Sequence, residues 1–397
     1  MLGVDERFPP PDRFAGSSDE LHALAARQVG SADFGADDYR LGLRVLLESM
    51  DYDPHFSKRG RTIAWGNLVN TLASRAHAVR AMKQKPALGQ VQIARPVVIT
   101  GLHRTGTTAL HKLLSVDPQF QGLQGWLTAA PMPRPPRAEW GTNPAFRRYV
   151  EQLEARFEAA SGMRAAHAMA ATEVDECGGI LCQNFVSIIW TVAWSAASYD
   201  AWWQTQSEAP SYAYFRRTLQ LISCHEPEKR WLLKHPPHLA QLALLFATFP
   251  DARVIQTHRD PAKSIPSLCS LLMKNHSLME VGRETQRAHM LGYRETGRAA
   301  KAIRDAEPVR QAHRHQIIDV LHGDFHRDPM AVVRRLYPFM GLDLSPDIEA
   351  AMTQYIAATA IPPEGSHLYS AREFGLAEDE IREQFGGYID RFDLRPK

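Results

Sequence analysis

Several features that mark specialised protein classes are missing from this sequence. It has only four cysteines, which form no C-x-x-C pair and no zinc-binding spacing, so we expect reduced, mostly buried thiols in a cytoplasmic protein. No apolar run is long enough to span a bilayer, and residues 1–6 lack the basic and apolar regions of a signal peptide. The net charge of +2 gives no indication of a nucleic-acid-binding surface.

The composition is that of a folded globular chain with a helical beginning. With 397 residues, 44% of them hydrophobic, the chain can bury one large core or two domains. Apolar residues recur at helical spacing in three segments, over about 18–28, 37–50 and 61–83. Ser17 and Glu20 have the spacing of a capping box at the first of them. We therefore predict a helical N-terminal extension over residues 1–90, followed by the main domain over residues 91–397.

The chain is organised around residues 96–117, a pattern typical of a strand, a tight loop and a helix. Pro96 opens a short β-branched run of the kind that is buried in parallel sheets. Gly101 and Gly106 bracket the loop, and the apolar residues after Gly106 fall on one face of a helix. The segment therefore predicts a strand whose carboxyl end turns directly into a helix N-terminus.

The loop between the two glycines is suited to an anion. Backbone N–H groups and the positive end of a helix dipole converge at such a turn. Thr105, Thr107 and Thr108 add hydroxyl donors, and Arg104 adds a full positive charge. The alternative is an ordinary strand–turn–helix with a glycine-rich turn, but the coincidence of glycines, threonines and an arginine favours phosphate binding.

One residue of a nucleoside-triphosphatase loop is absent. Such a loop has the form G-x-x-x-x-G-K-[ST], in which the lysine binds the β- and γ-phosphates. Gly101 and Gly106 have this spacing, but Thr107 occupies the lysine position and the positive charge lies inside the loop, at Arg104. This indicates a phosphate-bearing donor other than ATP–magnesium.

The fold class follows from strands that alternate with helices. The short apolar pattern recurs in three later segments: Trp231–Lys234, Arg253–Thr257 and Gln316–Leu321. We predict an α/β fold in which a P-loop-type parallel sheet is flanked by helices. Ligands bind beyond the carboxyl ends of parallel strands. Lys234, His235 and Arg259 follow such ends, as does the loop at Gly101, so we expect them to converge.

Two motifs of this chain resemble those of the sulfotransferases that use 3′-phosphoadenosine 5′-phosphosulfate (PAPS). The 5′-phosphosulfate loop of that family has the form (K/R)-(S/T)-G-T-T, which is Arg104–Thr108 here. Its 3′-phosphate site pairs an arginine at a strand end with a serine eight positions later, here Arg259 and Ser267. The resemblance is closest to a bacterial branch with a long helical N-terminal extension, and extends from about residue 35 to the end.

This resemblance implies an enzyme that moves the sulfuryl group of PAPS to a hydroxyl or amine of a small, apolar acceptor by in-line attack. It implies that the residues of the loop, Arg104, Thr105, Gly106, Thr107 and Thr108, hold the 5′-phosphosulfate and that Arg259 and Ser267 hold the 3′-phosphate. The acceptor and the oligomeric state are not indicated. The histidines match no H-E-x-x-H pattern, so we expect no metal.

The general base is left open among three residues. The cytosolic animal branch of the family has a catalytic histidine just before a Pro-Pro pair, and aligning that pair with Pro236-Pro237 places Lys234 or His235 near it. His235 could equally shape the turn before Pro236. Glu176 follows two other carboxylates and resembles a D/E-E-C motif of the family, although the cluster could also complement a helix dipole.

Aromatic residues are dense at two further places. Residues 121–137, rich in proline, are predicted to form an irregular wall of the acceptor cleft or an ordinary surface loop. Trp126-Leu127 departs from the Trp-Glu pair of many relatives, so no base role is transferred there. The tryptophans and tyrosines of residues 190–214 indicate either core or an acceptor pocket. Tyr369, near the C-terminus, is a candidate nucleotide contact.

Two other functions remain open from the residues alone. A P-loop kinase or other phosphotransferase would share the loop, but the missing lysine and the Arg259/Ser267 pair argue against it. A non-catalytic nucleotide-binding protein would keep the loop and lack the base.

Overall fold

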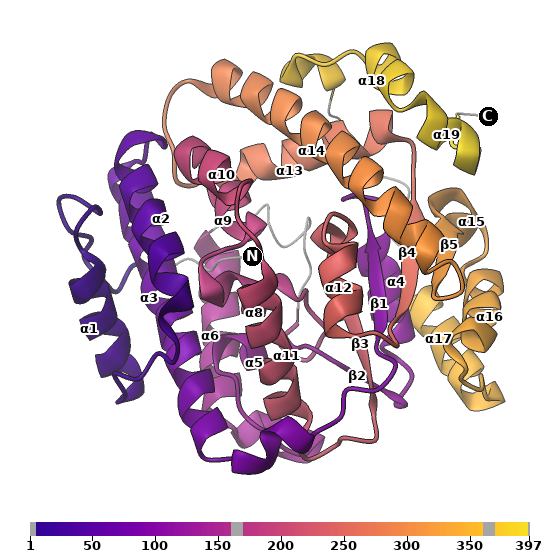
Figure 1. The fold of residues 1–397 in the computed structure, drawn as a ribbon, viewed down its shortest axis with the longest axis horizontal. Coiled ribbons are helices and arrows are strands. Elements are labelled where there is room, and N and C mark those ends of the chain that lie inside the picture. Colours follow the sequence, from indigo (N-terminus) through magenta and orange to yellow (C-terminus); the bar gives the residue numbers. More distant parts are fainter. Residues whose placement is uncertain (1–4, 160–169, 360–369, 396–397) are drawn as a thin grey trace. The chain divides into compact units, whose positions relative to one another are not determined.

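The fold is described from a computed structural model, which covers residues 5–159, 170–359 and 370–395 (Figure 1). Residue contacts divide the chain into two compact units. The first consists of Met1–Ile93, Leu123–Lys229 and Asn275–Gly282, and the second of Ala94–Gly122, Arg230–Lys274 and Arg283–Lys397. Because contacts alone define these units, the domain boundary expected at residue 90 stays a prediction.

The first unit begins with the three helices that the periodicity predicts. They are α1 (Ser18–Val29), α2 (Arg40–Tyr52) and α3 (Lys58–Lys83). The predicted capping box does not form, because the Ser17 hydroxyl donates to the Arg13 carbonyl oxygen (2.7 Å) and does not cap α1. The short helix η1 (Asp37–Tyr39) leads into α2, and η2 (Pro86–Gln90) follows α3 along the chain.

Short helices complete the first unit: α5 (Gly125–Ala129), η3 (Arg137–Thr142), α6 (Pro144–Ala159), α8 (Gly178–Leu181), η4 (Cys182–Asn184), α9 (Ile188–Ala193), α10 (Ala197–Trp203) and α11 (Ala209–Ser223). Trp190, Trp194 and Tyr199 are fully buried and pack in one core with Trp65 of α3 and Leu43 of α2. This burial supports the core interpretation of the aromatic segment rather than an acceptor pocket.

The proline-rich stretch after the loop helix is more regular than its sequence indicates. We expected neither a regular helix nor a central strand over residues 121–137, yet the helix α5 lies there, next to the end of the edge strand β2 (Phe120–Gly122). The expectation was wrong because the prolines begin only at Pro131, after α5 has ended. Trp126 of α5 is fully buried, in edge-to-face contact with Trp140 (ring centroids 5.4 Å apart).

The second unit contains a five-stranded parallel sheet, which confirms the predicted α/β fold. Its strands are β1 (Val97–Gly101), β2, β3 (Arg230–Lys234), β4 (Arg253–His258) and β5 (Ile317–Leu321), in the order β2-β3-β1-β4-β5. Val97 lies opposite Leu232 of β3 and Arg253 of β4. The three strands that lead to the predicted site residues are therefore neighbours, with β1 in the centre.

Helices flank this sheet: α4 (Thr107–Leu114), η5 (Pro236–Leu239), α12 (Leu242–Thr248), α13 (Pro261–Ser277), α14 (Glu284–Ala312), α15 (His322–Arg327), α16 (Pro329–Met340), α17 (Pro346–Thr359), η6 (Ala371–Phe374), α18 (Glu378–Gln384) and α19 (Gly386–Phe392). Ile99, Leu232 and Ile255 of the strands form one core with Leu113 of α4 and Leu336 of α16. Figure 1 shows α15 and α16 gathered beside β5. The predicted final helix is in fact two short ones, α18 and α19.

Candidate functional site

The turn from β1 into α4 has the backbone of a compact anion-binding loop. Gly101 (φ +146°), Arg104 (φ +64°) and Gly106 (φ +92°) all have positive φ angles. A Cβ atom on Gly101 would lie 2.5 Å from the Thr257 carbonyl oxygen, so no larger residue fits there. Gly106 is the N-cap of α4 and offers no side chain of its own to the first N–H groups of the helix. Those groups and the positive end of the helix dipole are directed at the loop.

Hydrogen bonds link the predicted charged residues at the carboxyl edge of the sheet. Arg104 Nε donates to Ser267 Oγ on α13 (3.1 Å), and Arg259 Nη1, just beyond β4, donates to the Arg104 carbonyl oxygen (3.0 Å). Lys234 Nζ, at the end of β3, donates to Thr108 Oγ1 in the first turn of α4 (3.2 Å). Residues from three separate parts of the sequence therefore converge on one loop, because their strands are adjacent and parallel.

The three threonines of the loop differ in their surroundings. Thr105 is buried, and its hydroxyl bonds to the Leu102 carbonyl oxygen and to Thr257 Oγ1, both at 2.6 Å. Because these two bonds occupy the Thr105 hydroxyl and hold the loop in shape, we expect Thr105 to contact a ligand through its backbone N–H. Thr107 is also buried, whereas Thr108 is exposed at the start of α4. Thr257 was missed by the sequence analysis, although its place at the end of the third predicted strand could have identified it.

The two candidates at the end of β3 lie in a tightly packed turn. Lys234 is 3% exposed and His235 is 2% exposed. The His235 backbone N–H donates to the Ile99 carbonyl oxygen (3.2 Å), and its ring packs edge-on against His238 (centroids 5.2 Å apart). Thr100 Oγ1 donates to the Pro236 carbonyl oxygen (2.9 Å). These contacts support a turn-shaping role for His235, while Lys234 directs its ammonium group to the first turn of α4.

The contacts of the loop do not test two other predicted residues. Glu176 belongs to the first unit, where its backbone N–H donates to Asp175 Oδ1 (2.7 Å), so its role as a base stays a prediction. Tyr369 lies outside the described residues.

A buried carboxylate on α14 was also missed. Glu295 is 4% exposed and accepts hydrogen bonds from Arg294 Nε (2.7 Å) and Arg298 Nη1 (2.8 Å). Burial alone would raise its pKa, but Arg298, Arg294 and His103 of the loop lower the pKa to about 2. Glu295 is therefore ionised and electrostatically linked to the loop.

The structure adds a histidine that the sequence analysis set aside. His322 follows β5 directly, at the same edge of the sheet. A Cβ atom on Gly106 would lie 3.3 Å from His322 Cδ2, so the imidazole packs against the loop. Its position after the fourth predicted strand was the signal that could have identified it.

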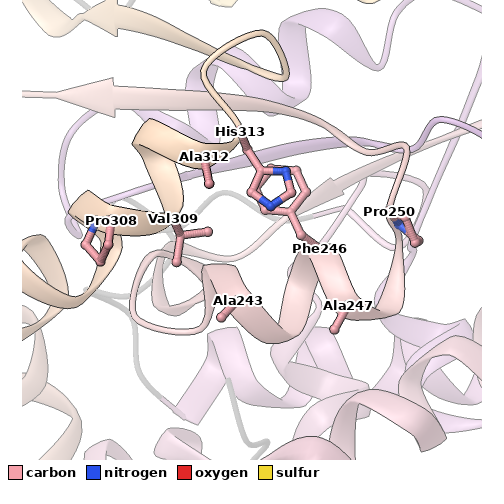
Figure 2. A pocket seen from close by; sticks show the side chains of 8 residues that line it. All are labelled: Ala243, Phe246, Ala247, Pro250, Pro308, Val309, Ala312 and His313. Atoms are coloured by element: carbon pink, nitrogen blue, oxygen red, sulfur yellow. The ribbon is translucent and has the colours of Figure 1, made fainter.

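An apolar hollow of about 480 Å³ lies elsewhere, between α12 and the end of α14 (Figure 2). Its residues Pro250 and His313 precede β4 and β5, which places it at the amino edge of the sheet. The His313 ring stacks on Phe246 there, with centroids 3.9 Å apart. This hollow is thus at the opposite edge from the candidate site.

Within residues 5–159, 170–359 and 370–395, no group of three or more His, Cys, Asp or Glu side chains is arranged to hold a metal ion. In the same part of the chain, no helix combines the length and apolarity needed to cross a membrane.

Comparisons with known proteins agree on one family. A model of the sulfotransferase family matches residues 96–346, well over half of the chain. Omega-hydroxy-beta-dihydromenaquinone-9 sulfotransferase Stf3 of Mycobacterium bovis is 26% identical over 313 residues, which cover 75% of this chain and 74% of Stf3.

Two solved structures resemble nearly the whole chain. Sulfotransferase STF1 from Mycobacterium tuberculosis has a TM-score of 0.80 at 36% identity, covering 94% of this chain and all of its own. Sulfotransferase STF9 from Mycobacterium avium has a TM-score of 0.88 at 25% identity, covering 98% of each chain. The phosphate-type loop, the parallel sheet and these matches lead to one conclusion: the chain belongs to the sulfotransferase family and is a sulfotransferase enzyme.

Proposed function

We propose that this sulfotransferase takes its sulfuryl group from PAPS and transfers it to a hydroxyl or amine of a small, apolar acceptor. The observation that carries the proposal is the hydrogen-bonded group of Arg104, Arg259 and Ser267 beside the loop. A second cation next to a phosphate loop suits a donor with phosphates at two positions, and the 3′-phosphate is the group that distinguishes PAPS from ATP.

Each part of the donor would be held by different residues. The N–H groups of the loop, Arg104 and the Thr107 and Thr108 hydroxyls would bind the 5′-phosphosulfate. Arg259 and Ser267 would bind the 3′-phosphate, so their present bonds to the loop would be exchanged for bonds to phosphate oxygens. The present acceptor of Arg259, the Arg104 carbonyl oxygen, is neutral, whereas a phosphate oxygen is charged, so the exchange adds the attraction between two opposite charges.

The reaction is a displacement at sulfur. The acceptor oxygen forms a bond to sulfur while the bond between sulfur and the 5′-phosphate oxygen breaks, and the proton of the acceptor hydroxyl passes to a base. Negative charge builds on the leaving oxygen, so positioned cations and backbone donors carry most of the catalysis. We assign this stabilisation to Lys234 and Arg104. For the base, Glu176 and His235 remain the two candidates.

The acceptor class is supported by one relative. As its name states, Stf3 is a sulfotransferase for an omega-hydroxy dihydromenaquinone, a molecule with an apolar body and a hydroxyl group. We propose that this chain acts on an acceptor of the same chemical character, with a hydroxyl on an apolar frame.

A thermal-shift experiment tests the donor. Ligands that bind the native state raise the apparent stability by mass action. We expect 3′,5′-adenosine bisphosphate to raise the melting temperature without added metal, and 5′-AMP and ATP–magnesium to do so much less. Stabilisation by ATP–magnesium alone would favour a phosphotransferase. Stabilisation by the bisphosphate with no transfer to a broad panel of acceptors would favour a non-catalytic binding protein.

A further inference from the structure

His322 stands out because it is a half-buried titratable group at the candidate site to which the proposed reaction gives no role. It begins α15 immediately after β5, at the edge of the sheet where β1 and β4 deliver the loop and Arg259. Its ring packs against Gly106, the N-cap of α4. A ligand anion held by the N–H groups of this turn would therefore lie close to the imidazole.

The groups around His322 are neutral or positively charged. Arg259 acts on it from the turn after β4, and His326 from α15, with ring centroids 4.2 Å apart. The loop that faces it carries Arg104, whose side chain points to Ser267. Burial, followed by the charges of Arg259 and His326, lowers the pKa of His322 to about 3. The imidazole is therefore neutral at ordinary pH while the site holds no anion.

We propose that His322 is a proton-accepting residue of the nucleotide site, which becomes protonated when the phosphate groups of the nucleotide bind beside Gly106 and Arg259. The inference rests on the proposed function, since it requires a phosphate-bearing ligand at this loop. It adds a residue to the site and makes nucleotide binding depend on pH.

The charge balance at the site explains the direction of the effect. A phosphate monoester carries a charge of about −1.5 to −2 at pH 7, which opposes the positive charges of Arg259 and His326 and leaves only burial to lower the pKa of His322. A nearby anion favours the protonated imidazole, so the pKa of His322 rises when the nucleotide binds. The nucleotide must then bind more tightly as the pH falls, by up to about tenfold per pH unit while one proton is taken up.

Proton uptake is diagnostic because the ligand has the opposite tendency. Contact with arginines lowers the pKa of a phosphate group and releases protons on binding. A net uptake of protons on binding therefore has to come from a protein group. We assign it to His322 because its ring packs against Gly106 of the loop.

Calorimetric titration with 3′,5′-adenosine bisphosphate tests the inference. We would measure the dissociation constant at pH 6.5, 7.5 and 8.5, each in two buffers of different ionisation enthalpy, for the wild type and for His322→Gln. The wild type should take up a proton and bind more tightly at lower pH, and His322→Gln should lose most of that pH dependence. His313→Gln is the matched control, because His313 lies at the amino edge of the sheet and should behave as the wild type.

The outcomes separate the two proposals. Parallel pH dependence in the wild type and His322→Gln overturns the role of His322. If His322→Gln does not fold, His322→Asn takes its place, because only a difference from a variant removes the protons that the ligand itself releases. Failure of the wild type to bind the bisphosphate at any of the three pH values would instead refute the proposed PAPS donor.

Discussion

At the scale of single residues, Arg259 is the side chain that should decide which nucleotide binds. Arg259→Ala removes the cation assigned to the 3′-phosphate but leaves the loop sequence unchanged. A charge-assisted hydrogen bond contributes roughly 1.5–3 kcal/mol, so affinity for 3′,5′-adenosine bisphosphate should fall roughly ten- to a hundred-fold. Affinity for 5′-AMP, which lacks that phosphate, should change little.

Calorimetry with both nucleotides measures this selectivity. Arg327→Ala, which removes an arginine that is 75% exposed on α15, is the matched control and should leave both affinities unchanged. Equal losses for the two nucleotides in Arg259→Ala would mean that Arg259 supports the loop without recognising the 3′-phosphate.

Arg75 is a second residue whose substitution should have a large effect, in this case on the free energy of unfolding. This arginine of α3 is 2% exposed and donates to the Phe34 carbonyl oxygen (2.8 Å), Asn184 Oδ1 (2.8 Å) and Asp38 Oδ1 (3.0 Å). Its guanidinium also lies 4.3 Å from the centre of the Tyr39 ring. Arg75→Met leaves two buried acceptors, the Phe34 carbonyl oxygen and Asn184 Oδ1, without their donor, so we expect about 2–6 kcal/mol lower free energy of unfolding.

Urea denaturation gives the measurement for Arg75→Met. The control is Arg395→Met, because Arg395 and its partner Asp390 are both more than 60% exposed, and such pairs contribute little. A loss of less than 1 kcal/mol in Arg75→Met would show that water replaces the missing donor. The sequence could not reveal this role, since the acceptors come from segments far from Arg75 along the chain.

At the scale of elements, local patterns were sufficient for strands and long helices. β1, β3, β4 and β5 all coincide to within a few residues with the apolar runs that predicted them, and α1, α2 and α3 follow the helical periodicity. Short elements were less predictable. The apolar segment around Phe185 forms several short helices and not one long helix, because Phe185 has a φ of +55° between η4 and α9. The burial that favours this left-handed turn depends on the surrounding helices and not on the local sequence.

The contact of α18 with the turn after β4 has a functional consequence. Arg382 of α18 donates to Asp260 Oδ2 through Nε (3.2 Å) and Nη2 (3.1 Å), while Asp260 Oδ1 accepts from the Ala262 N–H at the start of α13. Asp260 directly follows Arg259. We therefore infer that Arg382 is a positioning residue for Arg259, and Arg382→Gln should weaken bisphosphate binding about three- to tenfold.

Comparing the affinities for two ligands distinguishes an effect on the position of Arg259 from a general loss of fold stability. Arg382→Gln should affect binding of the 3′,5′-bisphosphate more than binding of 5′-AMP, because it acts through Arg259. Arg334→Gln provides the control, since Arg334 of α16 makes an exposed ion pair with Glu349. A lower melting temperature with unchanged affinities would restrict Arg382 to a structural role.

At the scale of the whole molecule, the alternation of strands and helices predicted a parallel sheet but not its order. The carboxyl ends of β1, β3 and β4 carry the loop, Lys234 and Arg259 because β1 lies between the other two strands. That order depends on pairings between segments more than a hundred residues apart, which no local pattern encodes. The convergence of Arg104, Arg259 and Ser267 was expected from family motifs, whereas His322 became apparent only from its packing against Gly106.

The stability of the second unit should depend on pH through a buried histidine. His258, at the end of β4, is fully buried between Tyr388 of α19 (Nδ1 to the hydroxyl, 2.8 Å) and Asp319 of β5 (Nε2 to Oδ1, 2.8 Å). Its ring stacks on Phe392, with centroids 3.8 Å apart. Burial, together with the nearby Arg310 and other cationic groups, lowers the pKa of His258 despite the opposing effect of Asp319.

The sign of the effect follows from proton binding in the two states. Below about pH 6.5 the unfolded chain binds a proton at His258 while the folded protein does not, so the free energy of unfolding falls as the pH falls. One such group contributes a slope of up to about 1.4 kcal/mol per pH unit. His258→Gln removes this contribution and should flatten the decline in stability between pH 6.5 and 5 by up to that amount, although it lowers stability at pH 7.

Urea denaturation at half-unit pH steps measures this slope for the wild type, His258→Gln and the control His315→Gln. His315 is exposed just before β5, so its substitution should leave the slope as it is in the wild type. The same slope in the wild type and in His258→Gln would mean that the pKa of His258 is equal in the folded and the unfolded protein. A steeper decline in His258→Gln than in the wild type would mean that His258 is protonated in the folded protein, paired with Asp319. In that case the contact of α19 with the sheet would depend on an ion pair, and Asp319→Asn would lower stability more than His258→Gln.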